Sequence, residues 1–118
     1  MQFRTRKLVK PEDLNPGGSL FGGQLLKWID EEAAIYAMCQ LDNHRVTTKF
    51  MSEIDFISPA KKGDVIEIGL ELVKMGRTSI TFRCEARVKK TEQTIITIDK
   101  IVFVNLDEKL KPTPHNKV

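Results

Sequence analysis

Apolar and polar residues alternate with a period of two along three long segments of the chain. The segments are residues 46–56, 66–72 and 80–88. Such alternation places one side of a strand against a core and the other in water, so it predicts half-buried antiparallel strands. A weaker alternation over residues 3–9 predicts an entering strand. Residues 94–105 predict a fifth strand, whose pattern falters at Asp99 and Lys100 and indicates a bulge or an end buried on both faces.

A single long helix is predicted between the first strand and the other four. Residues 11–19 are rich in proline and glycine and indicate a loop. Helix-forming residues then run from Gly22 or Gly23 to Leu41 without a further glycine or proline. Apolar residues occur nearly all round this helix, a distribution typical of a helix that other elements bury.

The dimensions of these elements favour an α+β fold in which the sheet curls around the helix. One helix is about 10 Å wide, whereas five strands spaced about 4.8 Å apart span about 24 Å. A flat sheet of that width would leave much of its apolar face uncovered. Because an exposed edge strand offers unpaired backbone groups to a second subunit, we expect a homo-oligomer.

Composition restricts the class of protein further. The chain has 118 residues, of which 41% are hydrophobic and 30% charged, as in one globular domain. Its net charge of +3 comes from scattered basic residues, which disfavours nucleic-acid binding. No apolar run approaches the roughly 20 residues that span a membrane, and no secretory signal is visible. We therefore expect a cytoplasmic protein, with a domain over residues 1–106 and a loosely held tail over residues 107–118.

Metal and nucleophile chemistry find little support in the sequence. Two cysteines supply neither a disulfide framework nor a zinc cluster, and no other metal-ligand spacing occurs. His44 and His115 have no spacing to each other or to a nucleophile that indicates a catalytic triad. We expect no metal.

Asp30 is the most conspicuous polar residue of the helix. At 100° per residue it lies on a stripe of small and apolar residues that includes Gly23, Ala33 and Ala37. An acid among alanines must be paired, shifted in pKa or used in chemistry. Glu31 and Glu32 point elsewhere and are interpreted as a solvated acidic face.

Gly22 and Gly23 stand at the predicted start of the helix. Paired glycines can simply form a tight turn. They also leave the amide groups of a helix N-terminus bare, and such amides can bind a developing oxyanion. Both interpretations stay open on the residues alone.

The combined spacing of these residues resembles the short bacterial and cytosolic acyl-coenzyme A hydrolases, which are thioesterases of the hotdog fold. The resemblance rests on Asn15-x-x-Gly18-x-Leu20-Phe21-Gly22-Gly23-x-Leu25-Leu26-x-Trp28-x-Asp30-Glu31. It continues through Phe56-x-x-Pro59, Gly63-Asp64, Gly76-Arg77-Thr78-Ser79 and Phe103-Val104-Asn105, and so covers almost the whole chain. It implies one long central helix wrapped by a curved five- or six-stranded antiparallel sheet.

The resemblance also implies roles for individual residues. The catalytic aspartate of the family falls on Asp30, its loop asparagine on Asn15 and its glycine amides on Gly22 and Gly23. The hairpin that lies near the coenzyme in relatives falls on Gly76, Arg77, Thr78 and Ser79, with Arg77 as the candidate phosphate ligand. The residues alone permit an ordinary hairpin turn there. Thr47 and Thr48 are expected to line the cleft, although threonine needs no special role in a strand.

The implied reaction is hydrolysis of the thioester bond of acyl-CoA, either by a water that Asp30 activates or through a covalent anhydride on Asp30. Coenzyme A is then part of the substrate, and no separate cofactor is expected. A non-catalytic acyl-CoA sensor on the same fold is the alternative. A hydratase of acyl thioesters usually needs a histidine beside the acid, and this helix has none.

The distance between the predicted groups predicts a shared active site. Gly23 and Asp30 are seven residues apart, which is about 10.5 Å along a helix. The oxyanion donor and the base must both approach one carbonyl within about 3 Å. Two antiparallel helices of a homodimer satisfy this requirement, and we expect the dimer to assemble further into a hexamer as a trimer of dimers.

Overall fold

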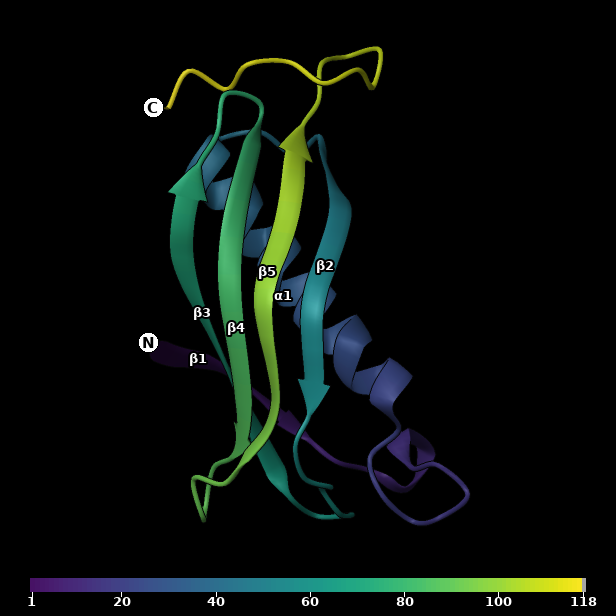
Figure 1. The fold of residues 1–118 in the computed structure, drawn as a ribbon. Coiled ribbons are helices and arrows are strands. Elements are labelled where there is room, and N and C mark those ends of the chain that lie inside the picture. Colours follow the sequence, from purple (N-terminus) through teal and green to yellow (C-terminus); the bar gives the residue numbers. More distant parts are fainter. Residues whose placement is uncertain (118) are drawn as a thin grey trace.

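The computed structural model describes residues 1–117 and contains one long helix against a five-stranded antiparallel sheet (Figure 1). The helix α1 spans Gly22–Leu41, and a short 3-10 helix spans Pro11–Asp13. The strands are β1 (Gln2–Leu8), β2 (Val46–Phe56), β3 (Val65–Met75), β4 (Ser79–Val88) and β5 (Thr94–Asn105). They are ordered β1-β3-β4-β5-β2. The predicted α+β hotdog architecture, with one helix and a curved sheet, is confirmed.

The core lies between α1 and the inner face of the sheet. Ile29, Ala33 and Ala37 of the helix are fully buried, as are the inward residues of the central strands β4 and β5. Phe82 and Phe103 on these two strands pack edge to face, with Tyr36 of the helix over Phe82. Alternation along the strands therefore supplies one side of the core, as predicted. No helix of residues 1–117 is long and apolar enough to cross a bilayer.

The fifth strand, β5, contains both irregularities that the sequence suggests, a bulge and an end that is buried on both faces. Phe82 pairs with Ile101 and Cys84 with Ile98, so β5 contains one extra residue between these positions. The bulge falls on Asp99 and Lys100, which are both exposed. Beyond it, every residue from Ile101 to Asn105 is buried.

The prediction of a half-buried strand over residues 46–56 is wrong for the second half of β2. The register against β5 shifts between Thr48 and Phe50, so Lys49 is an extra residue on β2. Thr48, before the bulge, bonds Asp30 of the helix as regular alternation allows, and Met51, after it, packs against the core, whereas Phe50 and Phe56 are exposed. A bulge moves the alternation by one position, which periodicity alone does not show. The edge strand β2 therefore leaves an apolar surface uncovered in the single chain.

The prediction of a loosely held tail is also wrong for the described part of residues 107–118. The Thr113 N–H donates to Asn105 O at 2.9 Å, and the Asn105 side-chain amide donates to Thr113 O at 3.0 Å. His115 is only 7% exposed. The tail lies across the end of the sheet, beside the turn between β3 and β4 (Figure 1).

Candidate active site

Asp30 lies half-buried on α1 and faces the edge strand β2. The Thr48 hydroxyl donates a hydrogen bond of 2.6 Å to Asp30 Oδ1. The other carboxylate oxygen, Oδ2, accepts no hydrogen bond from residues 1–117. The neighbouring Ala33 and Ala37 are buried and small, so the stripe predicted around Asp30 is present. Thr48 thus fixes one oxygen of the carboxylate and leaves the other available.

Thr47, the other threonine predicted at the cleft, lies on the opposite face of β2. Its side chain is exposed, and its backbone pairs with Val104 of β5. The acidic neighbours of Asp30 divide in a similar way. Glu31 is exposed, as the solvated interpretation predicts, but Glu32 is half-buried and accepts a 2.6 Å hydrogen bond from the Thr5 hydroxyl.

Gly22 and Gly23 form the first turn of α1 and present two backbone donors. The N-cap residue Phe21 makes no side-chain cap, and the first turn contains no acidic residue. Neither glycine N–H has an acceptor within residues 1–117, whereas Gln24 N–H donates to Phe21 O. A Cβ on Gly23 would lie 2.8 Å from the Phe21 ring. This helix terminus therefore carries an uncompensated positive dipole end with two available amides.

Asn15 belongs to the loop that precedes the helix. Its Oδ1 accepts from the Ser19 N–H at 3.1 Å, and its backbone N–H donates to Ser19 O at 2.7 Å. A backbone donor can only meet the amide oxygen, so the Nδ2 group of Asn15 points away from Ser19. Leu20 N–H donates to Ala60 O, which ties the loop to the segment after β2.

Asp13 anchors the same loop. No sequence motif predicts this role. It is 3% exposed, and its two oxygens accept from the Lys10 N–H at 2.8 Å and the Gln24 side-chain amide at 3.0 Å. Phe21 N–H in turn donates to Asp13 O. Because Gln24 lies in the first turn of α1, Asp13 fixes where the loop meets the helix.

The hairpin Gly76–Ser79 joins β3 to β4. Gly76 N–H donates to Ser79 O at 2.9 Å, and a Cβ on Gly76 would clash with Ser79 Oγ. The Arg77 side chain is exposed. The hairpin is thus a tight turn in which a larger residue at position 76 would displace the Ser79 side chain, and it presents one guanidinium to solvent.

The fold brings Asp30 close to the hairpin within one chain. Thr48, Phe103 and Ile80 form one row across β2, β5 and β4, and Ile80 follows the hairpin directly. Two strand spacings, about 10 Å, separate the outer members of this row. Gly22 instead lies beside the Phe56 ring at the far end of β2, where a Cβ on Gly22 would come within 3.2 Å of that ring. Asn15 and the glycine amides therefore lie away from the hairpin, at the other end of the molecule (Figure 1).

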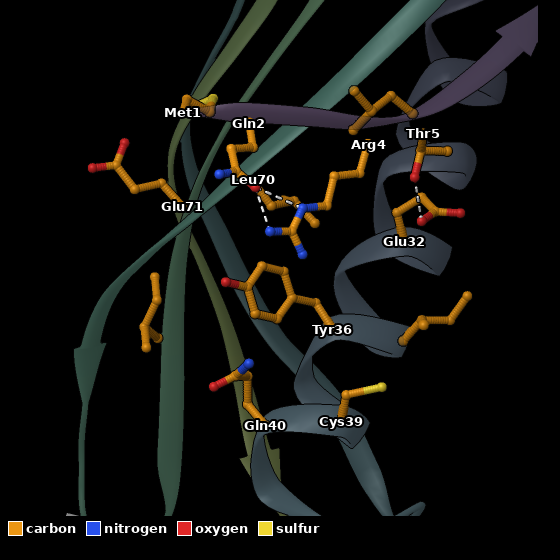
Figure 2. A pocket seen from close by; sticks show the side chains of 13 residues that line it. Met1, Gln2, Arg4, Thr5, Glu32, Tyr36, Cys39, Gln40, Leu70 and Glu71 are labelled. Carbon is orange, nitrogen blue, oxygen red and sulfur yellow. Dashed lines mark hydrogen bonds between the residues drawn. The ribbon is translucent and has the colours of Figure 1, made fainter.

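One hollow of the single chain lies elsewhere, between α1 and the strands β1 and β3 (Figure 2). It is a groove of about 560 Å³ whose helical wall includes Glu32, Tyr36 and Cys39. These residues lie about half a turn from Asp30. Arg4 reaches over the groove and donates to the Gln2 side-chain oxygen. None of the predicted site residues lines it.

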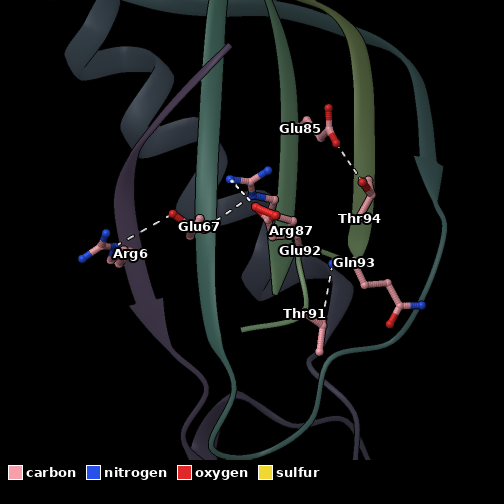
Figure 3. Close-up of polar contacts among 8 residues, drawn as sticks. All are labelled: Arg6, Glu67, Glu85, Arg87, Thr91, Glu92, Gln93 and Thr94. Carbon is pink, nitrogen blue, oxygen red and sulfur yellow. Dashed lines mark hydrogen bonds and ion pairs between the residues drawn. The ribbon is translucent and has the colours of Figure 1, made fainter. Parts of the chain in front are cut away.

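The buried carboxylate of Glu67 lies on the outer face of the sheet, where ion pairs neutralise its charge (Figure 3). Glu67 lies 3.4 Å from Arg87 and 4.0 Å from Arg6, and the Arg87 guanidinium covers the Phe3 ring at 3.8 Å. Two cations compensate this charge, so it supports the sheet. Within residues 1–117, no group of three or more His, Cys, Asp or Glu residues is placed to hold a metal.

Comparisons with known proteins converge on one family. A profile of the thioesterase superfamily matches residues 17–95. The acyl-CoA thioester hydrolase YciA of Salmonella typhimurium is 34% identical over 115 residues, which cover 92% of this chain and 86% of the relative. The hexameric thioesterase y2039 of Yersinia pestis shares the fold with a TM-score of 0.87 at 29% identity, over 96% of this chain and 93% of that structure.

An acyl-CoA hydrolase of Staphylococcus aureus, solved with butyryl coenzyme A, coenzyme A and coenzyme A disulfide, matches with a TM-score of 0.82. The two are 30% identical over 93% of this chain and 66% of that one. Alanine variants of that enzyme have been solved at an asparagine, at an aspartate 15 positions later and at a threonine 17 positions after the aspartate. Asn15 and Asp30 stand at the same interval here. Thr47 is 17 positions beyond Asp30, and Thr48 is one further.

Proposed function

The chain belongs to the thioesterase superfamily, and from that membership we propose that it hydrolyses acyl-coenzyme A to a free fatty acid and coenzyme A. One observation supports this activity most directly. Asp30 is held through one oxygen by Thr48 on a helix whose Gly22 and Gly23 N–H groups have no acceptor within residues 1–117. A fixed base and available oxyanion donors are the two groups that thioester hydrolysis needs.

In the proposed mechanism Asp30 acts as general base. Its Oδ2 accepts a proton from water as that water attacks the thioester carbonyl, while Thr48 holds Oδ1. The N–H of Gly22 or Gly23 donates to the developing oxyanion, and the Nδ2 group of Asn15 orients water or substrate. Coenzyme A leaves as a thiolate, which needs no strong general acid. Attack of Asp30 itself on the carbonyl, through a covalent anhydride, is the alternative route.

The hairpin Gly76–Ser79 is proposed to bind the coenzyme. Arg77 is exposed in the hairpin beside the strand row formed by Ile80, Phe103 and Thr48, whose last member bonds Asp30. A guanidinium suits a phosphate of coenzyme A, because it donates in a planar fork. This attraction acts in solvent, so the affinity should fall as salt rises from about 0.05 to 0.5 M.

The active site is proposed to form between two chains. Asp30 bonds Thr48 and Gly22 lies beside Phe56, so base and oxyanion donors lie along opposite parts of β2 in one chain. A two-fold axis can bring Asn15 and Gly23 of one chain to Asp30 of the other. The exposed Phe50 and Phe56 of β2 offer the apolar surface that such a partner would cover. We propose a dimer as the functional unit and a trimer of dimers, since the Yersinia pestis relative is hexameric.

The decisive experiment measures thiol release from a panel of acyl-CoAs of different chain lengths. The purified Cys39→Ser variant is the enzyme of choice, because exposed Cys39 would itself consume the thiol reagent. Asp30→Asn in the same background is the control. Release of coenzyme A from none of the substrates, together with tight acyl-CoA binding, would favour a sensor instead.

A further inference from the structure

The described tail folds back on β5 and crosses the end of the sheet. Asp107 N–H donates to Lys111 O, and the Asp107 carboxylate accepts from the Lys109 and Lys111 N–H groups, which closes a turn after β5. Leu106 and Pro112 then form an antiparallel bridge. The chain beyond this bridge runs alongside the hairpin Gly76–Ser79 (Figure 1).

Three successive carbonyls of the hairpin accept hydrogen bonds from this region. Arg77 O accepts from the His115 N–H at 3.2 Å, and Thr78 O accepts from the Asn105 N–H at 2.7 Å. Ser79 O lies 3.0 Å from His115 Nε2, besides its bond from Gly76. His115 therefore engages the hairpin on both sides of Thr78, once through its backbone and once through its side chain.

The hydrogen bonds of His115 also define its tautomer. Lys117 N–H donates to His115 Nδ1 at 3.1 Å, so Nδ1 is an acceptor. In a neutral imidazole the proton then lies on Nε2, where it can be donated to Ser79 O. Both ring nitrogens of this buried side chain are thus satisfied, which is typical of a residue that fixes its neighbours.

We propose that His115 is a positioning residue for coenzyme binding. It holds the hairpin through its carbonyl groups, so that the Arg77 guanidinium is presented to solvent from a fixed backbone. A turn ordered before binding loses less conformational entropy when a phosphate arrives, and this raises affinity without a direct contact. The inference rests on the proposed role of the hairpin in holding coenzyme A.

The test compares His115→Ala, His115→Gln and Arg77→Ala, with Glu108→Ala at an exposed position of the same tail as the control. Loss of the one side-chain hydrogen bond that reaches the hairpin should raise the Kd for free coenzyme A, and the KM for acyl-CoA, by about three- to tenfold in His115→Ala. The kcat should stay within about twofold, because Asp30 and Thr48 are untouched. His115→Gln, whose amide can donate to Ser79 O, should recover most of the affinity.

Hydrogen exchange supplies a readout independent of turnover. The Gly76 and Asn105 amides, which donate to the hairpin carbonyls, should exchange faster in His115→Ala than in the wild type and in His115→Gln. Unchanged coenzyme affinity in His115→Ala, or lost affinity without faster exchange, overturns the inference. If Arg77→Ala also binds coenzyme A normally, the hairpin is not the coenzyme site, whereas thiol release from acyl-CoA tests the hydrolase activity separately.

Discussion

Two hydrogen bonds between a threonine and a carboxylate, each 2.6 Å long, lie on opposite faces of α1. On one face Thr48 of β2 donates to Asp30, and on the other Thr5 of β1 donates to Glu32. The local chemistry is the same. The surroundings differ, because Asp30 lies among small residues at the exposed edge formed by β2, whereas Glu32 lines the groove beside Tyr36 and Cys39.

This difference distinguishes the groove at Glu32 from the proposed active site at Asp30. The groove at Glu32 is complete within one chain, yet no amide donor of a helix terminus and none of the predicted site residues line it. The face of α1 that carries Asp30 is open in the single chain, but it borders the apolar surface of β2 that a second chain can cover. An active site that forms between subunits need not coincide with a cavity of either one.

The largest expected difference between the two faces comes from neutralising the Asp30 and Glu32 carboxylates in turn. Asp30→Asn keeps the shape of the side chain but removes the base, so kcat should fall by about 10²–10⁴-fold. Glu32→Gln is the matched control, and its kcat should stay within about threefold of the wild type. Steady-state kinetics on one acyl-CoA, with circular dichroism to verify folding, measure both. A loss of less than threefold in Asp30→Asn would remove Asp30 from the mechanism.

A mixed dimer tests whether the Asp30 face needs a second chain. Asp30→Asn and Asn15→Ala are co-expressed with different tags, and the dimer that carries both tags is purified. If each site takes Asn15 from one chain and Asp30 from the other, one site carries both changes and the second is wild type. Activity should then return to about half of the wild-type value per dimer.

The homodimers of each variant, mixed after purification, are the control for this experiment. If Asn15 and Asp30 of the same chain formed each site, every site would carry one lesion. A mixed dimer as inactive as its parents would therefore contradict a shared site while leaving the hydrolase activity in place.

The sequence predicts the elements of this fold well because they depend on local periodicity. Alternation locates the five strands, and the run from Gly22 to Leu41 without an internal break after Gly23 locates the helix. The bulge at Lys49 is invisible to the same pattern, because an extra residue on one strand is defined by its pairing with another. That bulge is why Met51 faces the core while Phe50 is exposed.

Residues that bind backbone groups are the part of the site that the sequence conceals. Asp13 accepts from the Lys10 N–H and from the Gln24 side chain, whereas His115 contacts Ser79 O of a distant hairpin, and no sequence motif marks either residue. The tail around His115 looks like a polar extension in the sequence. The pairing of Asn105 with Thr113 and the bonds of His115 to the hairpin show in the structure that it folds back on the sheet.

Removing each threonine hydroxyl should distinguish the two faces by a smaller amount. Thr48→Val leaves the Asp30 carboxylate free to turn, so we expect kcat to fall by about tenfold, in the range of one hydrogen bond to a charged group. Thr5→Val removes an equal bond from Glu32 and should change kcat by less than about twofold. Kinetics of both variants, with thermal unfolding as a check on folding, provide the measurement. Equal losses of kcat in both variants would contradict the distinction.

The two cysteines provide the mildest test, because one lies in the groove and the other in the core. Burial, with a smaller contribution from Glu85, raises the pKa of the Cys84 thiol to about 12, so the folded chain keeps it protonated at pH 8. Cys39 is exposed and lines the groove. A thiol reagent at pH 8 should therefore modify about one group per native chain, and Cys84 only on unfolding.

Modification of Cys39 then tests whether the groove between α1, β1 and β3 takes part in turnover. Because Cys39 points about half a turn away from Asp30, the labelled protein should retain its kcat within about twofold. The assay follows loss of thioester absorbance, which the label does not affect, and Cys39→Ser treated in the same way is the control. Loss of activity in the labelled wild type but not in treated Cys39→Ser would place the groove in the path of the substrate. The two faces of α1 would then serve one site.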